Sequence, residues 1–495
     1  MVSVVVFFPV VVALVLAGMP GLRDMVARGT WVAVTVIEVG LAAWMWAAES
    51  ASPGGLAFEE KVAWIPGVHS SYHVGVDGLS LPLVVLTNVL FLACAIYALR
   101  QRERPRTHAA LFLALQTTCL GLFVAQDLLV FFVFFDLSIV GMYFVIAGWG
   151  HGNAARSALK FFLYTFFGSL ALLLGFIGLY LAADPHTFDM VELTEQTPLN
   201  GHGTTGALVL AAILLGLAIK TPTFPFHTWL PPAHTDAPAA GSAILAGVLL
   251  KMGTYGFLRI AMPMLPQAWR AWAWVIVAVG IVSVLYGALV SLAQTDFKRM
   301  VAYTSVNHMG YIVLAVGVAG LVTDSSAEAA QVAITGAVVQ MVSHGLLTGA
   351  LFLLAGMLRE RSGTYRMASF GGLAAAAPRY SGLFAIAAFA SLGIPALSGF
   401  IAEFQIFAGA IGVTVIAAAA LPGIVLIAAV LLRALQQMLT GPPHAASIDF
   451  ADARPAETIS IGFLLALSVL IGVLPRPLLD VIAPAAASIT TVLGR

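Results

Sequence analysis

Charged residues are rare in this chain. Asp, Glu, Lys and Arg make up only 9% of its 495 residues, and hydrophobic residues make up 60%. A typical soluble domain has roughly 25% charged residues. With a mean hydropathy of +0.99, the composition predicts an integral membrane protein whose length lies almost entirely in the bilayer.

Other absences exclude whole classes of function. The formal net charge is zero, so nothing favours a nucleic acid as a partner. Cys94 and Cys119 are too few for a disulfide framework and lack metal-ligand spacing, so we interpret both as small core residues. The chain has no CxxC, GxGxxG, Walker or HExxH motif. We therefore expect no flavin, nicotinamide, ATP, iron–sulfur cluster or other metal site in this chain.

Apolar windows define the predicted fold. A helix needs about 20 apolar residues to cross about 30 Å of hydrocarbon. Such windows lie near 2–19, 31–48, 79–99, 109–126, 128–148, 158–182, 206–229, 238–261, 267–291, 300–320, 329–357, 380–410, 412–438 and 457–474. No basic region precedes the first window, so we interpret it as a transmembrane helix and not a cleaved signal. The prediction is an all-α polytopic membrane protein with about fourteen transmembrane helices.

Basic residues in the loops orient these spans. If both termini lie outside, most lysines and arginines fall in cytoplasmic loops, as the positive-inside rule requires. The cytoplasmic set is Arg23, Arg28, Arg100, Arg102, Arg104, Arg106, Arg156, Lys298, Arg299, Arg359, Arg361, Arg366, Arg379, Arg433 and Arg454. The outer set is Lys61, Arg259, Arg270, Arg476 and Arg495. The longest connector, 49–78, is too short for a soluble domain, so we expect function to reside among the helices.

Several titratable residues fall inside the predicted spans. They are Lys160, Lys220, Lys251, Glu38, Asp136, Glu403, His308 and His344. A charge in hydrocarbon costs at least about 2.5–3.5 kcal/mol, and its default interpretation is a functional site. Burial favours the neutral form of each group, whereas an opposite charge nearby favours the charged form. That balance suits a proton relay, and the alternative is that these charges form structural ion pairs between helices.

Some of these residues fit a relay less well. A single histidine in a bundle is often only hydrogen-bonded, so His308 and His344 fit either role. Glu38 stands apart in the second span and fits a structural or lipid-edge position. Lys160 lies near a helix start, where it would either snorkel to the interface or line a channel. His227 and His234 lie in the proline-rich stretch 221–238, which favours loop positions over proton handling.

Prolines interrupt two of the spans. Pro222 and Pro225 break the seventh span directly after Lys220, because proline lacks an N–H and clashes with the preceding turn. Pro395 breaks the twelfth span eight residues before Glu403. Interrupted helices in corresponding halves are typical of a transporter repeat and its ion path.

The two breaks are five spans apart, and an odd offset makes the two halves inverted relative to each other. The predicted units are 1–108 (helices 1–3), 109–261 (first five-helix repeat), 262–440 (inverted second repeat) and 441–495 (helix 14 and tail).

At 220–259 the chain reads KTPTFPFHTWLPPAHTDAPAAGSAILAGVLLKMGTYGFLR. It closely resembles the antiporter-like membrane subunits of respiratory complex I, specifically the M type (the chain-4 type of mitochondria). The supporting motifs are FFVFFDLSIVGMYFVIAGWG at 131–150, KFFLYTFFGSL at 160–170, DFKRMVAYTSVNHMGY at 296–311, SHGLLTGALFLLAGMLRER at 343–361 and GFIAEF at 399–404. The resemblance covers most of the chain and is densest over 126–410.

The resemblance assigns a role to each site residue. Asp136 and Lys220 would pair, and Lys251 would be the central relay. His308 and His344 would connect Lys251 onward to Glu403, the outlet toward the periplasmic side. Lys160 matches a further lysine of the sixth helix. The family usually has Glu where this chain has Asp136, so the carboxylate is one methylene shorter.

The resemblance also implies the setting. The chain would be a proton-translocating subunit of an NADH–quinone oxidoreductase in the bacterial plasma membrane, beside L-type and N-type antiporter-like neighbours and lipid. Partner subunits would hold FMN and iron–sulfur clusters, and this chain would bind no quinone. The alternatives are an Mrp-type cation/proton antiporter subunit, the equivalent subunit of a membrane-bound hydrogenase or related dehydrogenase, and a non-conducting scaffold subunit.

Overall fold

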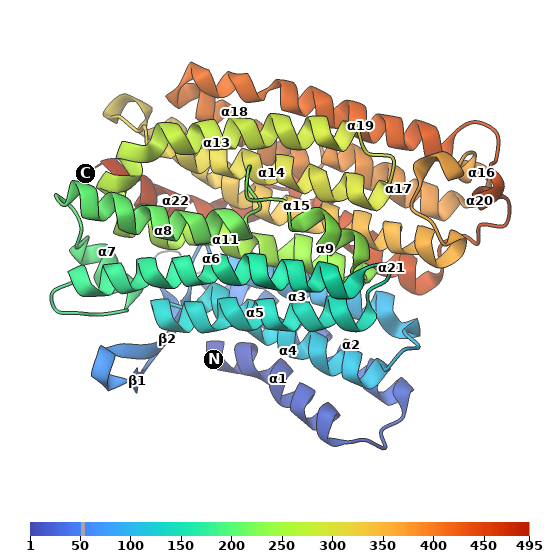
Figure 1. Cartoon of the computed structure of the whole chain (residues 1–495), viewed down its shortest axis with the longest axis horizontal. Coiled ribbons are helices and arrows are strands. Elements are labelled where there is room, and N and C mark those ends of the chain that lie inside the picture. Colours follow the sequence, from blue (N-terminus) through green and yellow to red (C-terminus); the bar gives the residue numbers. More distant parts are fainter. Residues whose placement is uncertain (51–54, 495) are drawn as a thin grey trace.

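Long apolar helices dominate the computed structural model, which describes residues 1–50 and 55–494. Thirteen helices in this described part are long and apolar enough to cross a membrane, and α1 and α18 are shorter apolar helices. The helices of the first half are α1 Val2–Gly18, α2 Asp24–Ser50, α3 Leu81–Tyr97, α4 Pro105–Val124, α5 Leu128–Trp149, α6 Ala154–Ala182, α7 Met190–Gln196, α8 Gly203–Lys220 and α9 Leu230–Asp236. Most of them lie roughly parallel, along the long axis of Figure 1.

The eighth span and the second half follow the same direction. The eighth span is one continuous helix built of α10 Ala239–Ile244, the π turn η3 Leu245–Leu249, α11 Leu250–Gly256, the π turn η4 Phe257–Ala261 and α12 Met262–Met264. After it come α13 Pro266–Leu292, α14 Phe297–Ala319, α15 Ala327–Ser362, α16 Leu373–Ala376, α17 Pro378–Ser391, α18 Ser398–Val413, α19 Pro422–Leu439, α20 Ala445–Ile448, α21 Pro455–Val473 and α22 Arg476–Gly494. Each of the fourteen predicted windows coincides with one of these spans, so the predicted fold class is confirmed.

Both predicted helix breaks are present. α8 ends at Lys220, and the chain runs without regular structure before α9 begins at Leu230. α17 ends at Ser391, and α18 begins at Ser398 on the other side of Pro395. The inverted relation of the two halves and the boundaries at 108, 261 and 440 stay predictions.

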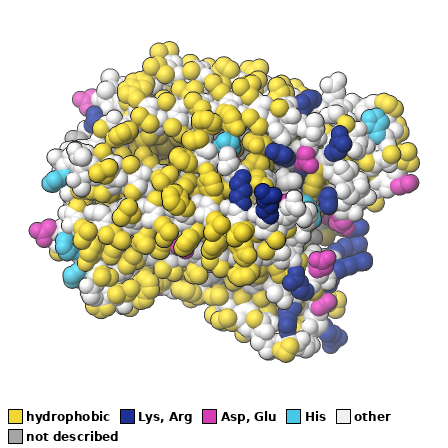
Figure 2. Space-filling model, in the orientation of Figure 1, with side chains coloured by type: hydrophobic (Ala, Val, Ile, Leu, Met, Phe, Trp, Pro, Cys, Tyr) yellow, Lys and Arg dark blue, Asp and Glu magenta, His cyan; other side chains and the backbone are white. Residues whose placement is uncertain are grey.

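The two ends of the bundle differ in charge. Figure 2 shows hydrophobic side chains over the middle of one face and most Lys and Arg side chains toward one end. We call this the basic end, and it includes Arg104, Arg359, Arg361 and Arg454. The buried guanidinium of Arg361 donates to Glu457 Oε2 at 2.6 Å and ties α15 to α21. Breaking such a buried pair on one side typically costs about 3–5 kcal/mol.

The opposite end carries a β-hairpin, and we call it the hairpin end. Strands β1 Ala57–Ile65 and β2 Ser70–Val76 pair antiparallel. The N-terminal amine contacts Glu60 of β1, and the C-terminal helix ends at the same side of the bundle (Figure 1). The two termini therefore share one end, as the orientation argument requires. Arg495, which that argument placed on the outer side, lies outside the described residues.

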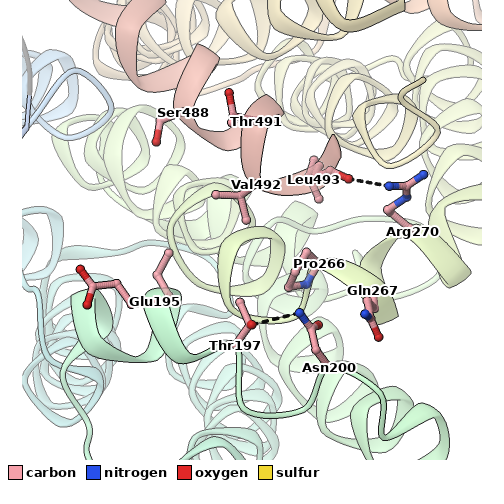
Figure 3. Close-up of a pocket in the computed structure, with 11 residues that line it drawn as sticks. Glu195, Thr197, Asn200, Pro266, Gln267, Arg270, Ser488, Thr491, Val492 and Leu493 are labelled. Carbon is pink, nitrogen blue, oxygen red and sulfur yellow. Dashed lines mark hydrogen bonds between the residues drawn. The ribbon is translucent and has the colours of Figure 1, made fainter. Parts of the chain in front are cut away.

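Helix α22 lies across the hairpin end, although by length and composition it qualifies as a membrane span. Its hydrogen bonds reach the hairpin ends of other helices. Gln331 Nε2 donates to the carbonyl of Ala483 at 3.3 Å, and Arg270 donates to that of Leu493 at 2.8 Å. Figure 3 shows the Arg270 contact at the rim of a pocket of about 750 Å³ beneath α22. Apolar side chains recur every three or four residues on its buried face, which is typical of a helix lying on a surface.

A buried histidine ties the hairpin to the bundle. His73 lies with Nδ1 2.6 Å from Asp189 and Nε2 2.9 Å from Glu59. Lys61 Nζ lies 2.8 Å from the same Asp189 carboxylate, which also caps α7. Burial alone would lower the pKa of His73. The hydrogen bond and charge of Asp189 and the hydrogen bond of Glu59 outweigh burial and raise the pKa, and Lys61 has a smaller opposing effect.

The hairpin is expected to loosen at high pH. The folded-state pKa of His73 is raised, so its contribution to stability is full below about 6.5 and is lost as the pH rises through the folded-state pKa. Burial would raise the pKa of Asp189, but its hydrogen bonds with His73 and Lys61 lower it to about 2, so its contribution is lost only in strong acid. Amide hydrogen exchange over 57–76, corrected for intrinsic pH dependence, measures the change.

A matched pair of variants separates His73 from a general effect of pH. His73→Gln should remove the loss of protection at high pH, whereas His69→Gln, at an exposed turn position of the same hairpin, should keep it. A persistent pH-dependent loss in His73→Gln would contradict the assignment.

Candidate functional site

Lys251 occupies the centre of the bundle and contacts a histidine. Its side chain is 0% exposed, and Nζ lies 2.6 Å from Nδ1 of His344 on α15. An ammonium has only donors, so the ring nitrogen accepts and His344 is neutral in this arrangement. If the proton moves to the ring, the amine becomes the acceptor. The two groups can therefore exchange one proton without a large movement.

A π turn shapes the helix beside Lys251. The turn η3 ends just before α11, and Lys251 Nζ donates to the carbonyl of Ala246 at 2.6 Å. This carbonyl lies five residues earlier, inside the turn. π turns are rare and frequently occur at functional sites. The sequence carries no recognised signal for one, so this feature was not predicted.

His308 and Glu403 continue from His344 toward α18. The rings of His344 and His308 are 5.4 Å apart between centroids and nearly perpendicular. His308 Nε2 lies 4.0 Å from Oε1 of Glu403. Among the described residues, Nε2 of His344 and Nδ1 of His308 have no hydrogen-bond partner. Buried orphan nitrogens of this kind are typical positions for bridging water.

The second helix break holds the carboxylate of Glu403. Gly393 lies in the break with φ +72°, and a Cβ on it would stand 2.7 Å from Oε2 of Glu403. The position needs glycine both for its left-handed backbone and for the close approach of the carboxylate. The break therefore places the Glu403 carboxylate directly against the backbone of Gly393.

The predicted Asp136–Lys220 pair is not a direct contact. Lys220 Nζ donates to Ser138 Oγ at 3.2 Å and lies 4.5 Å from the ring centroid of Phe135. Asp136 faces Ser169 on α6, and its Oδ1 has no hydrogen-bond partner among the described residues. The Asp side chain leaves the carboxylate one methylene nearer its own backbone than Glu would. The two groups still interact electrostatically.

Ser138 contacts both Lys220 and the residue next to Lys251. Its hydroxyl, which accepts from Lys220, lies 3.4 Å from the sulfur of Met252. Met252 is the residue after Lys251. One serine and one thioether thus separate the Lys220 region from the Lys251 region, and both side chains are buried.

A pocket of about 500 Å³ opens near the basic end. Lys160, His227, Asp236, Tyr286 and Tyr303 are among its lining residues. Lys160 Nζ donates to the carbonyl of Thr228 at 2.7 Å, in the break after α8. Its side chain is exposed and lines this polar pocket, near the start of α6.

The structure corrects the placement of two residues between this pocket and Lys251. His234, predicted in a loop, lies in α9 with 0% exposure, and its ring stacks on Phe352 at 4.5 Å. Lys298, predicted in a cytoplasmic loop, is also 0% exposed and donates to the carbonyl of Ala237 at 2.5 Å. That bond ties Lys298 to the C-terminal end of α9, where a cation interacts favourably with the helix dipole. A charge two residues into a helix looks solvent-exposed in sequence, so Lys298 was missed.

Glu38 and the two cysteines lie outside this set. Glu38 is 0% exposed in α2 and so is not at the lipid edge. Cys94 and Cys119 are free and buried, as predicted. Within residues 1–50 and 55–494, no group of three or more His, Cys, Asp or Glu could hold a metal ion.

Comparisons with known proteins decide the family. The family model described as NADH:quinone oxidoreductase/Mrp antiporter, TM matches residues 125–431. The chain belongs to this family. NADH-quinone oxidoreductase subunit M of Rickettsia prowazekii is 39% identical over 431 residues, covering 86% of this chain and 84% of the relative. Its Rhodobacter capsulatus counterpart is 36% identical, covering 98% and 95%.

Solved structures agree with the fold. A chain of respiratory complex I from Thermus thermophilus matches with a TM-score of 0.88 at 30% identity, over 100% of both chains. A chain of the Mrp complex from a Dietzia species has a TM-score of 0.85 at 23% identity, which shows a shared fold alone. The predicted resemblance to the antiporter-like membrane subunits is therefore confirmed, and the Mrp alternative has weaker support.

Proposed function

We propose that this chain translocates protons as a membrane-arm subunit of an NADH–quinone oxidoreductase. One observation carries the proposal: Lys251 and His344 share a proton-exchange contact of 2.6 Å at the buried centre of the bundle. The M-type relatives at 36–40% identity support the assembly to which the chain belongs. A related dehydrogenase subunit M from Methanosarcina mazei, named for F(420)H(2), is 37% identical, so similarity alone leaves the electron donor open.

Protons would enter the site from the basic end. The pocket lined by Lys160 and His227 reaches α9, and the charged neighbours of buried His234 are Lys298 and Lys251. From Lys251 the proposed path continues through His344 and His308 to Glu403. From Lys251 onward, each step joins groups that are hydrogen-bonded or separated by about one water, which proton transfer requires.

Asp136 and Lys220 would control the charge of Lys251. Neither group lies on the proposed path itself. A charge on Lys220, transmitted past Ser138 and Met252 through a medium of low dielectric, makes a second charge on Lys251 less favourable. Movement of Lys220 toward Asp136 would relieve that repulsion. Redox chemistry in partner subunits, which would hold FMN and iron–sulfur clusters, would drive this switch.

The charge distribution and the relatives support a setting for the chain. The basic end would face the bacterial cytoplasm by the positive-inside rule, and the hairpin end with both termini would face the periplasm. The chain would lie in the plasma membrane between L-type and N-type neighbours, in contact with lipid, and would bind no quinone.

Glu403→Gln tests the proposal in membrane vesicles. The substitution keeps the shape but removes the exchangeable proton, so we expect proton translocation per NADH oxidised to fall on the order of 10-fold or more, since one proton-transfer group is typically worth about 10²–10⁴-fold. Uncoupled NADH oxidation should persist. Wild-type translocation in Glu403→Gln would refute the outlet, and sodium-dependent pH changes without NADH would favour the Mrp-type function.

Two glycine variants control for placement of the carboxylate. Gly393→Ala should reproduce the loss, because its Cβ would displace Glu403. Gly363→Ala imposes a similar backbone strain at φ +73°, but no described atom lies within 4 Å of the added Cβ, so its translocation should stay normal.

A further inference from the structure

A second group of buried polar side chains lies apart from the proposed path, among α2, α3 and α4. Its members are Glu38, Asn88 and Gln116, and all three are 0% exposed. Gln116 Nε2 donates to Asn88 Oδ1 at 2.8 Å, and Asn88 Nδ2 donates to the backbone carbonyl of Glu38 at 3.3 Å. Each residue lies near the middle of its helix, so the cluster lies near the bilayer midplane.

Helix packing directs Glu38 toward the interior. Trp31, on the same helix, packs its ring on Phe112 of α4 at 5.0 Å. Glu38 follows Trp31 by seven residues, which returns it to the same helix face two turns further along. Gln116 follows Phe112 by one turn on α4, and both helices run from the basic end to the hairpin end. The carboxyl of Glu38 therefore points into the bundle beside Gln116, away from lipid.

The cluster has more acceptors than the described residues satisfy. Both carboxyl oxygens of Glu38 and Oε1 of Gln116 have no hydrogen-bond partner in the described part of the chain. An ionised carboxylate buried without a partner is very costly, whereas the protonated acid is neutral and supplies an O–H donor. Three orphan acceptors in one polar cluster are also typical of a site that holds ordered water.

Helix α4 connects this cluster to the Lys220 region. Gln116 and Cys119 are one turn apart on α4, and the Cys119 thiol and Lys220 are electrostatic neighbours. We propose that Glu38 is a further proton-binding residue, which together with water at Asn88 and Gln116 forms a side branch that exchanges protons with the Lys220 region. The exchange rests on the proposed function, whereas the protonation of Glu38 does not.

Infrared spectroscopy of the purified complex tests the protonation without turnover. The carbonyl stretching band of a protonated carboxyl should be present at neutral pH in the wild type and in Glu38→Asp. It should be weaker in Glu38→Gln by the contribution of one carboxyl, because other protonated carboxyls such as Glu403 still absorb. Identical bands in the wild type and Glu38→Gln would mean that Glu38 is ionised, and would overturn the proposal whether or not Lys251 carries protons.

Proton translocation in vesicles tests the exchange. Glu38→Gln should lower translocation per NADH at least about 2-fold. This is a small part of the roughly 10²–10⁴-fold worth of a proton-transfer group on the path, because the branch reaches only the Lys220 region. Glu38→Asp should restore it. Thr35→Val, a buried substitution on the same helix with no titratable group, should leave it normal. If Glu38 were only structural, Glu38→Gln would match the wild type, and that result would overturn the branch.

Discussion

Lys251→Met is expected to abolish proton translocation while leaving the complex assembled. Lys251 is the centre of the path, and its Nζ contacts both His344 Nδ1 and the Ala246 carbonyl at 2.6 Å. Removing the group that exchanges protons should reduce translocation by about 10²-fold or more. The measurement is proton uptake by vesicles during NADH oxidation, compared with uncoupled oxidation by the same vesicles.

The stability cost of Lys251→Met should be modest. The methionine side chain matches the lysine stem in volume. The substitution also removes a buried charge, and the effect of such a replacement on stability is often neutral or favourable. It also leaves the histidine nitrogen and the carbonyl unpaired, at about 1–3 kcal/mol. These effects oppose each other, so normal amounts of assembled complex are expected. A complex that fails to assemble would point to a scaffold role.

Lys251→Arg separates charge from proton exchange. Arginine keeps the positive charge but does not deprotonate in proteins, so translocation should fail as in Lys251→Met. Normal translocation in Lys251→Arg would show that a fixed charge is sufficient, and would contradict the exchange between Lys251 and His344. Lys61→Met, which removes an exposed lysine on the hairpin, serves as the control.

Hydropathy and proline positions were enough to predict the transmembrane fold. Each apolar window became a span because backbone groups in hydrocarbon must bond within a helix. Pro222 and Pro225 located one break, and Pro395 located the other. The hairpin at 57–76 was missed, since a short connector carries no hydrophobic period long enough to separate strands from loop. α22 was missed because apolar residues alone do not distinguish a helix that lies across the end of the bundle from one that passes through the membrane.

The candidate site was only partly visible in the sequence. Lys220, Lys251 and Glu403 were found because a charge inside a long apolar run is rarely accidental. Lys298 and His234 were misplaced, since burial near a span end depends on how α9 folds back, which no local pattern shows. The contact between Lys251 and His344 joins residues 93 positions apart, and single-sequence reasoning supplies no distances between helices.

Lys220→Met is the second substitution with a large expected effect. Lys220 is 1% exposed at the end of α8, and its amine donates to Ser138 Oγ at 3.2 Å. Without the charge on Lys220, its repulsion no longer opposes the protonation of Lys251. Lys251 then has no change of charge nearby to drive the release of its proton. Translocation per NADH should fall by about 10²-fold, comparable to Lys251→Met, while uncoupled oxidation persists. Normal coupling in this variant would remove Lys220 from the mechanism.

Variants at Asp136 and Ser138 decide how Lys220 acts. Asp136→Asn removes the charge that would attract Lys220 and should reduce coupling, whereas Asp136→Glu extends the carboxylate by one methylene and should preserve or strengthen it. Ser138→Ala removes the hydroxyl that holds the amine at 3.2 Å, so it should weaken coupling less than Lys220→Met does. Equal effects of Asp136→Asn in the wild-type and Ser138→Ala backgrounds would show that the two residues act independently. A smaller effect in the Ser138→Ala background would show that Ser138 positions Lys220 for its movement toward Asp136.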